Sequence, residues 1–145
     1  MAGASFTMDT SGLEKMLKGA ISHLNDTDEL MAAVGEAWVS STKERFEDGE
    51  GPDGEPWKVS KRAEEEGGQT LVDDKILKGS ISSEYSASTV AVGSNNDVYA
   101  AIHQFGGEDV DMPEIEARPF VGINEEDIEE AQFMVSEFMQ EGFGI

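Results

Sequence analysis

The chain has 145 residues, no cysteine, and a formal net charge of -21 from 31 Asp and Glu residues against 10 Lys and Arg. This length is enough for one domain with a buried core, and the lack of cysteine excludes disulfides, thiolate metal sites and a cysteine nucleophile. The charge repels the phosphates of nucleic acids and anionic lipids, so specific nucleic-acid binding and membrane binding are disfavoured.

Two amphipathic helices are predicted at the start of the chain. Ser11 can cap the first helix, with Glu14 three residues further on. Its apolar residues follow at helical spacing: Leu13, Met16, Leu17, Ala20, Ile21 and Leu24. After a break at Asn25, Asp26 with Glu29 can open the second helix, and the short break predicts an antiparallel pair. The inward stripe of the second helix is expected at Leu30, Val34, Ala37, Trp38 and Ser41.

A flexible acidic arm is predicted from about residue 47 to residue 70. Gly, Pro, Glu and Lys dominate this stretch, and it has almost no aliphatic residues with which to order itself. Pro52-Asp53-Gly54 predicts a turn, because proline presets φ and glycine accepts the reversed one. Trp57 is the exception in this polar arm. Its ring either folds back over the edge of the core or anchors on a neighbouring subunit, since tryptophan is enriched at interface hot spots.

A β-hairpin is predicted after a short helix or turn at residues 71–81. Residues 81–87 and 89–94 are its strands, the second with alternating valines. A short helix should follow from Tyr99 and stop at Phe105, because the next two glycines can take the left-handed conformation that ends a helix. The residues expected on its apolar face and at its end are Val98, Ile102, Phe105, Gly106 and Gly107.

Pro119 is expected to launch a further strand. It fixes its own φ and disfavours the α region for Arg118, so residues 120–123 should be extended. Asn124 can then cap a C-terminal helix whose first turn, 125–127, is acidic. Its expected core stripe is Ile128, Ala131, Val135 and Phe138. Four more apolar residues point to a second buried face, in the core or against another subunit: Phe133, Met134, Met139 and Phe143.

These elements predict one α+β domain over residues 1–145. The two N-terminal helices and the C-terminal helix should pack on a small antiparallel or mixed sheet, with the long acidic loop beside it. No segment approaches the ~20 apolar residues that span a bilayer, and the first residues lack a secretory signal pattern. We therefore expect neither membrane insertion nor secretion.

Residues with catalytic potential lack the partners that catalysis requires. His103 lies one turn after Tyr99, and we interpret it as a packing or hydrogen-bonding residue rather than a base. The carboxylates around residue 50 lack the ligand order of a calcium loop, so no metal is expected. Arg118, among so many carboxylates, suits a bidentate pair, either within the chain or between subunits. The sequence predicts no enzyme and no cofactor.

Five short motifs occur in a distinctive order: PDGEPW at 52–57, LKGSI at 77–81, VAVGS at 90–94, YAAIHQFGG at 99–107 and ARPFVGI at 117–123. With an acidic loop between the last two and a helix after them, this order resembles the phage virion-morphogenesis or tail-completion family, which includes proteins of Mu-like and other contractile-tailed phages. The structural residues of the motif would be Tyr99, His103, Phe105, Gly106 and Pro119. The chain departs from the family pattern at residues 74–76, where Asp-Lys-Ile replaces Thr-Gly, so the turn there should differ.

The resemblance implies a structural protein of late virion assembly, which completes the tail and helps to join it to the head. We expect a homo-oligomeric ring, with a hexamer as the expected size, that caps the tail tube as a tail terminator and presents a surface to head connector proteins. Such a ring needs two different complementary patches on each subunit. The candidate contact residues are Trp57, Arg118, Phe120, Phe133, Met139 and Phe143. The expected location is the host cytoplasm during assembly, and then the neck of the virion.

Three alternatives compete with this reading. The first is a head-side adaptor or connector at the neck, and the second is a small acidic module that mimics DNA. The third is a lytic or nucleic-acid-processing enzyme, for which no acid-base or metal constellation is present. The acidity itself has two explanations. It either lines a channel through which DNA passes without sticking, or it serves solubility in a salty environment.

Overall fold

The computed structural model describes residues 5, 7–71, 76–96 and 99–145. Helices dominate it, and its described part has one two-stranded antiparallel sheet, which confirms the predicted α+β class. In chain order the elements are α1 (Ser11–Leu24), α2 (Asp28–Asp48), α3 (Lys61–Glu66), α4 (Ile76–Gly79), β1 (Ile81–Tyr85), β2 (Val90–Ser94), α5 (Ala100–Phe105), the 3-10 helix η1 (Glu108–Val110) and α6 (Glu125–Phe143). Within this part of the chain, no helix has the length and apolar character needed to cross a membrane.

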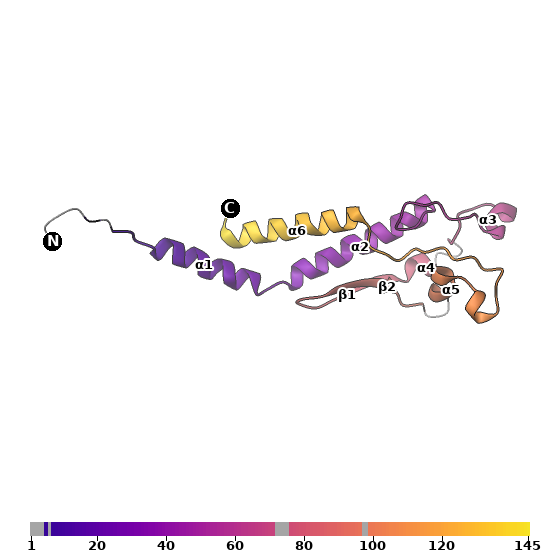
Figure 1. Ribbon diagram of the computed structural model, residues 1–145, viewed down its shortest axis with the longest axis horizontal. Helices are drawn as coiled ribbons and strands as arrows, with labels where there is room; N and C mark the ends of the chain where they lie inside the picture. Colours follow the sequence, from indigo (N-terminus) through magenta and orange to yellow (C-terminus); the bar gives the residue numbers. More distant parts are fainter. Residues whose placement is uncertain (1–4, 6, 72–75, 97–98) are drawn as a thin grey trace.

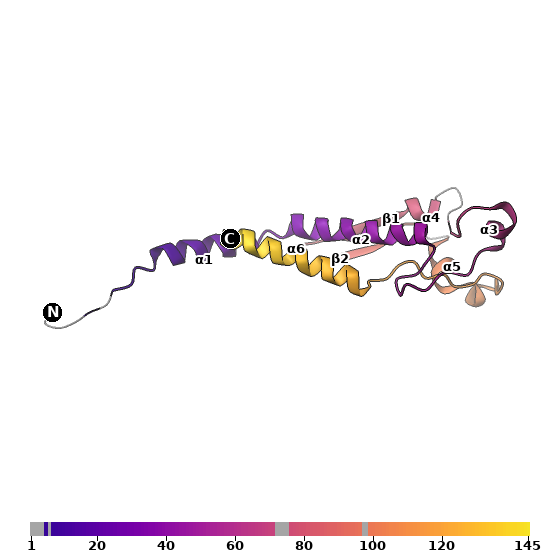
Figure 2. The ribbon, with the colours of Figure 1, turned by 90° about the horizontal axis from the view of Figure 1, so that it is seen from above.

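The molecule is elongated, and α2 forms its spine. Helices α1 and α2 follow one another along the long axis, and α6 runs back beside them (Figure 1; Figure 2). The β1–β2 hairpin packs on the side of α2 away from α6. The predicted antiparallel pair of the first two helices is therefore wrong, since the antiparallel neighbour of α1 is α6.

The link between α1 and α2 does not reverse the chain because its backbone stays close to helical. Asn25 keeps a right-handed conformation, with φ -84° and ψ -11°, and its N–H donates to the carbonyl of Ile21. The predicted caps, Ser11 and Asp26, are each off by one residue. Thr10 precedes the first turn of α1 and Thr27 that of α2, and neither side chain makes a capping hydrogen bond.

The hairpin matches its prediction and lies directly against α2. Its register pairs Ile81 with Ser94 at one end and Tyr85 with Val90 at the other. Gly35 makes the close approach possible: a Cβ built there would lie 2.7 Å from the Ser83 hydroxyl oxygen. A side chain at this position would push the helix and the sheet apart.

The densest part of the core joins segments that are far apart in sequence. Phe46, near the end of α2, is fully buried and meets the ring of Trp57 edge-on, with centroids 5.6 Å apart. The ring of Phe120 also contacts that of Phe46, with centroids 5.4 Å apart. Leu77 and Ile81 close the cluster from α4 and β1. The core therefore lies at the end of α2 that is distant from α1 (Figure 1).

The predicted arm is anchored to this core by Trp57. The indole ring is buried, as the first of its two predicted roles required, and its Nε1 donates to the carbonyl of Pro119 at 2.8 Å. The expected turn is present at Gly54, whose φ is +76° and whose N–H donates to the carbonyl of Gly51. Beyond Trp57 the arm forms α3, capped by the side chain of Ser60. Its flexibility stays a prediction.

Helix α6 begins as predicted but is rolled about its axis relative to the prediction. Asn124 and Asp127 form a capping box, each side chain accepting from the other's backbone N–H. The face toward α1 and α2 includes Asp127, which is buried, whereas the expected core residues Ile128 and Val135 are 47% and 40% exposed. The expected core stripe is therefore wrong at these two positions.

A buried ion pair explains this roll. Arg45, on α2, is 5% exposed and places Nη2 at 2.5 Å from the Asp127 carboxylate. Its Nη1 donates to the carbonyl of Gly122 at 2.7 Å, just before α6 begins. The indole Nε1 of Trp38 donates to the Asp127 carbonyl at 3.1 Å. These polar contacts hold the first turn of α6 on α2. The spacing of the apolar residues of α6 gives no sign of them.

We expect Arg45→Met to lower the free energy of unfolding by about 3 to 5 kcal/mol, because it leaves the Asp127 carboxylate buried without its cation. Adding Asp127→Asn should recover part of this loss, since the amide oxygen can still accept from the Asn124 N–H. Urea unfolding followed by circular dichroism measures both values. An Arg45→Met variant as stable as the wild type would contradict the role assigned to the pair.

Candidate functional site

The family-like motifs converge on one region, where α5 meets the segment 116–121. Gln104 joins the two. Its Oε1 accepts from the backbone N–H groups of Phe120 and Val121, at 3.0 and 3.1 Å, and its Nε2 donates to the carbonyl of Val121 at 3.0 Å. One amide side chain thus satisfies three backbone groups, as a neighbouring strand would.

The expected strand at residues 120–123 is therefore wrong. These residues belong to no strand in the structure. Their polar backbone groups are satisfied by Gln104, and Phe120 faces the core with 1% exposure. Pro119 does set the extended entry, and its carbonyl accepts from Trp57.

Two glycines after α5 allow the chain to pass close to itself. The helix ends at Phe105 as predicted, and Gly106 has φ +83°. Gly107 is buried, and a Cβ built there would lie 2.0 Å from the carbonyl oxygen of Met112. Phe105 differs from its prediction, because its side chain is 77% exposed and does not line the core. Val98, expected on the same face, lies outside the described residues.

Arg118 is buried and clamps the arm to this region. Its Nε donates to the carbonyl of Lys58 at 2.7 Å, and its backbone N–H donates to the carbonyl of His103 at 2.7 Å. Its guanidinium group donates to the carbonyl oxygens of Lys58 and Glu116, and the expected bidentate carboxylate pair is not seen among the described residues. Nearby, Glu116 pairs with Lys58 at 2.5 Å, and that hydrogen bond holds the pKa of the Glu116 carboxyl below its ordinary value.

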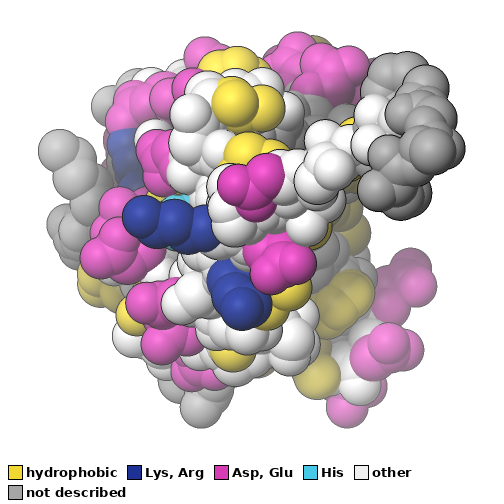
Figure 3. All heavy atoms as spheres, turned by 90° about the vertical axis from the view of Figure 1, so that its left-hand side faces the viewer, with side chains coloured by type: hydrophobic (Ala, Val, Ile, Leu, Met, Phe, Trp, Pro, Cys, Tyr) yellow, Lys and Arg dark blue, Asp and Glu magenta, His cyan; other side chains and the backbone are white. Residues whose placement is uncertain are grey.

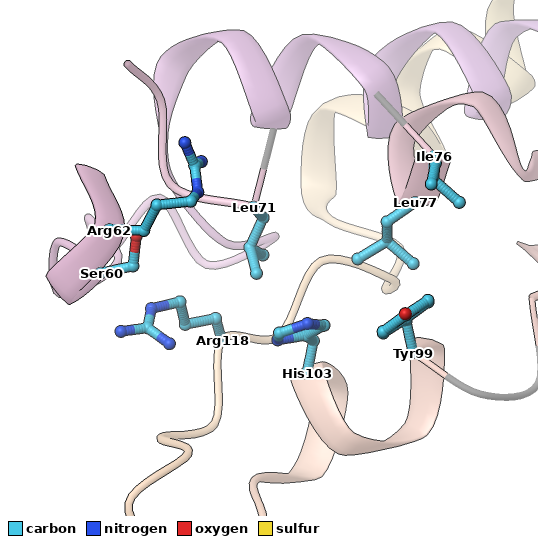
Figure 4. A pocket seen from close by; sticks show the side chains of 8 residues that line it. All are labelled: Ser60, Arg62, Leu71, Ile76, Leu77, Tyr99, His103 and Arg118. Atoms are coloured by element: carbon cyan, nitrogen blue, oxygen red, sulfur yellow. The ribbon is translucent and has the colours of Figure 1, made fainter. Parts of the chain in front are cut away.

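Between α3, α4 and α5 lies a cavity of about 310 Å³. Figure 4 shows its lining: Ser60, Arg62, Leu71, Ile76, Leu77, Tyr99, His103 and Arg118. None of these lining residues carries a carboxylate, which is unusual in so acidic a chain. The nearby departure from the family pattern falls at residues 74–76, of which only Ile76 is described.

His103 lines this cavity. Burial lowers its pKa from the ordinary value of 6.5, and the neighbouring Arg118 cation lowers it further. Its Nδ1 is buried without a hydrogen-bond partner in the described part of the chain. A histidine facing a cation, with no nucleophile or carboxylate aligned on it among the lining residues, fits a packing role.

No group of three or more His, Asp and Glu side chains in the described ranges is arranged to hold a metal ion. The surface offers apolar side chains instead. We define three sets. The α1 stripe is Leu13, Met16, Leu17 and Ile21; the α6 stripe is Ile128, Val135 and Met139; and the end patch is Phe105, Val110 and Met112. The α1 stripe lies toward one end of the molecule, the α6 stripe lies along its middle, and the end patch follows α5 toward the opposite end (Figure 1).

The predicted contact residues divide into two groups. Trp57, Arg118 and Phe120 are buried inside the chain. Phe133 and Met139 are 63% and 43% exposed on α6, and Phe143 is half-buried at its end. Exposed large apolar side chains are typical of surfaces that meet a partner, so the second group remains available for contacts with other proteins.

Sequence reasoning missed Gln104, Arg45 and Asp127. Gln104 lies inside the IHQFGG motif, where a polar residue between apolar neighbours could have drawn attention to it. Arg45 continues the inward face of α2 three and seven residues after Thr42 and Trp38, so a cation at that position signals a buried partner. Asp127 carries no such signal, because it stands among other acidic residues of an N-terminal turn.

We expect Gln104→Ala to lower the free energy of unfolding by about 2 kcal/mol or more, because three backbone groups lose their partner. Gln104→Glu should cost less, since it keeps the oxygen that accepts from Phe120 and Val121. Gln69→Ala is the matched control at an exposed glutamine and should change stability by less than about 0.5 kcal/mol. Equal effects of the two alanine substitutions in urea unfolding would contradict the role given to Gln104.

The lowered pKa of His103 predicts a pH-dependent stability. Below about pH 6.5 the unfolded chain binds a proton at this histidine that the folded chain binds less readily, so the free energy of unfolding falls as the pH drops. His103→Leu should reduce the difference in stability between about pH 7.5 and about pH 5.5, where carboxylates titrate little. Urea unfolding at the two pH values measures it, and an unchanged difference would contradict the prediction.

Comparison with known proteins agrees with the motifs. The family model described as "Phage virion morphogenesis family" matches residues 8–140. The chain is 37% identical over 123 residues to a Haemophilus influenzae protein named "Mu-like prophage FluMu G protein 2", with 81% of this chain and 79% of the relative covered. No solved structure matched the chain. The chain therefore belongs to the phage virion morphogenesis family.

Proposed function

We propose that this chain completes the phage tail and takes part in its joining to the head, as a subunit of a ring that caps the tail tube. Family membership supports a part in building the virion. The observation that carries the finer proposal is that an elongated subunit exposes apolar side chains on α1 and α6 and, toward its opposite end, after α5. Such side chains are costly to leave in water and are typical of subunits that function in an assembly.

The two ends suit two different kinds of contact. The α1 stripe, toward one end, and the α6 stripe, along the middle, are different surfaces, as a closed ring built from head-to-tail contacts requires. At the other end, the end patch follows α5 and projects Phe105 into solvent. We assign this end to a second protein of the tail or of the head connector.

The charge of the chain is consistent with a ring through which DNA passes. Each subunit carries a formal charge of -21, so a ring multiplies a field that repels phosphates. DNA would then slide through the opening without binding to its wall.

Deleting the gene from the phage or prophage that carries it tests this function. We expect filled heads and separate tails of abnormal length or with unfinished ends, seen by electron microscopy, and restoration by the wild-type chain supplied in trans. Normal particles from the deletion would contradict the proposal. Labelled chain found on isolated heads and absent from tails would assign it to the head side instead.

A surface variant separates assembly from folding. Phe105→Glu, in the end patch, should abolish complementation while leaving the circular dichroism and the unfolding midpoint unchanged, because this side chain is mostly in water. Tyr85→Glu is the matched control, since it changes an exposed aromatic residue of β1 outside the end patch. Full complementation by Phe105→Glu would remove the end patch from the proposal.

A further inference from the structure

Helix α1 has one apolar face, and the chain itself covers only half of it. At the C-terminal half, Ala20 is 2% exposed, and the ring of His23 stacks on Phe138 of α6 with centroids 4.2 Å apart. Leu17 and Leu13 precede Ala20 by three and seven residues, so they continue the same face toward the N-terminus. Both are more than 40% exposed.

The uncovered half lies beyond the reach of α6. Helix α6 ends at Phe143, and the first turns of α1 project past this end (Figure 1; Figure 2). A helix of this length is marginal in water unless an apolar face is packed. Leu13, Met16 and Leu17 of the α1 stripe therefore lack the covering that Ala20 and His23 receive from α6.

The α6 stripe has matching dimensions and is also uncovered. Ile128, Val135 and Met139 fall seven and four residues apart and line one face beside the buried face of α6. At 1.5 Å per residue, the α1 stripe is about 12 Å long and the α6 stripe about 16 Å long. Both stripes carry large aliphatic side chains that can interdigitate.

Charge decides between the possible occupants of the α1 stripe. Lys15 and Lys18 against Glu14 give α1 a net charge of +1, within a chain of -21. Helix α6 has seven acidic residues and no Lys or Arg. One of the seven, Asp127, is paired with Arg45. Figure 3, which looks onto the α1 end, shows basic and apolar side chains side by side among carboxylates. Two α1 helices facing each other would instead bring lysines together.

We propose that the projecting half of α1 docks its stripe on the α6 stripe of a second copy of this chain. Lys18 then lies near the acidic border of the α6 stripe, at Glu129. The second copy's own α1 stays free to dock on a third copy, so the contact propagates head to tail and can close into a ring. This proposal rests on the proposed function, in which the chains form a ring, and it identifies the two surfaces that join neighbouring subunits.

Disulfide crosslinking tests the contact directly, because the chain has no cysteine of its own. A Leu17→Cys chain is mixed with a Val135→Cys chain that carries a tag, and the disulfide-linked heterodimer is identified by mass. The Ser11→Cys chain is the matched control, since Ser11 is exposed on the opposite face of the same projecting turns. The Leu17–Val135 pair should give a severalfold higher yield than the Ser11–Val135 pair, in solution or in purified particles.

Charge reversal gives a second measurement that does not depend on folding of the core. Lys18→Glu should lower the Leu17–Val135 crosslink yield, and Glu129→Lys in the partner chain should restore it, with both effects weakening at high salt. Equal yields for the Leu17 and Ser11 pairs, in solution and in particles alike, would overturn the proposal. So would a predominant link between two Leu17→Cys chains.

These outcomes are distinct from failure of the proposed function. If the gene is required for joined particles and the Leu17–Val135 link is absent from them, the function stands and the α1–α6 contact falls. If the deletion yields normal particles, the function falls whatever the crosslinks show.

Discussion

The buried ion pair between Arg45 and Asp127 determines how α6 lies on the remainder of the molecule. Rolling α6 to bury Ile128 and Val135 fully, both already half-covered, would gain about 1.5 to 3 kcal/mol. The same roll would separate Asp127 from Arg45 and leave a buried charge unpaired, at a cost of about 3 to 5 kcal/mol. The ion pair is the larger effect, so apolar side chains of α6 remain at the surface. An interaction inside the subunit thereby decides which face it offers to others.

Toward the other end of the molecule, Gln104 has a comparable role in holding separate segments together. It supplies to residues 120 and 121 the hydrogen bonds that a third strand would have supplied. The hairpin can then stay two-stranded, because the extended segment is satisfied by α5. Because Gly107 has no side chain, the chain at this residue can pass close to the carbonyl oxygen of Met112. Hydrogen bonds thus join the two family-like motifs, YAAIHQFGG and ARPFVGI, to each other.

Much of this fold follows from local patterns in the sequence. The hairpin, the end of α5 at Phe105 and the Asn124 cap depend on alternation, glycine and capping chemistry within a few residues, and all three are present. The antiparallel pairing of the first two helices, the strand at Phe120 and the core stripe of α6 depend on partners more than 15 residues away in the chain. A single sequence does not report those partners. The burial of Trp57 was one of two open alternatives for the same reason.

The arm and the C-terminal third are tied together across the full middle of the chain. Trp57 reaches Pro119 and Arg118 reaches Lys58, so two neighbouring hydrogen bonds close a loop of about sixty residues. Closing a loop costs entropy, and this cost grows only slowly with the length of the loop. Once the first hydrogen bond has closed the loop, the second forms without that cost. The positions of Trp57 and Lys58 in the arm are therefore coupled to those of residues 118 and 119. Cleavage of the arm next to Trp57 and Lys58 would weaken the hold on residues 118 and 119, to which α5 is also bonded.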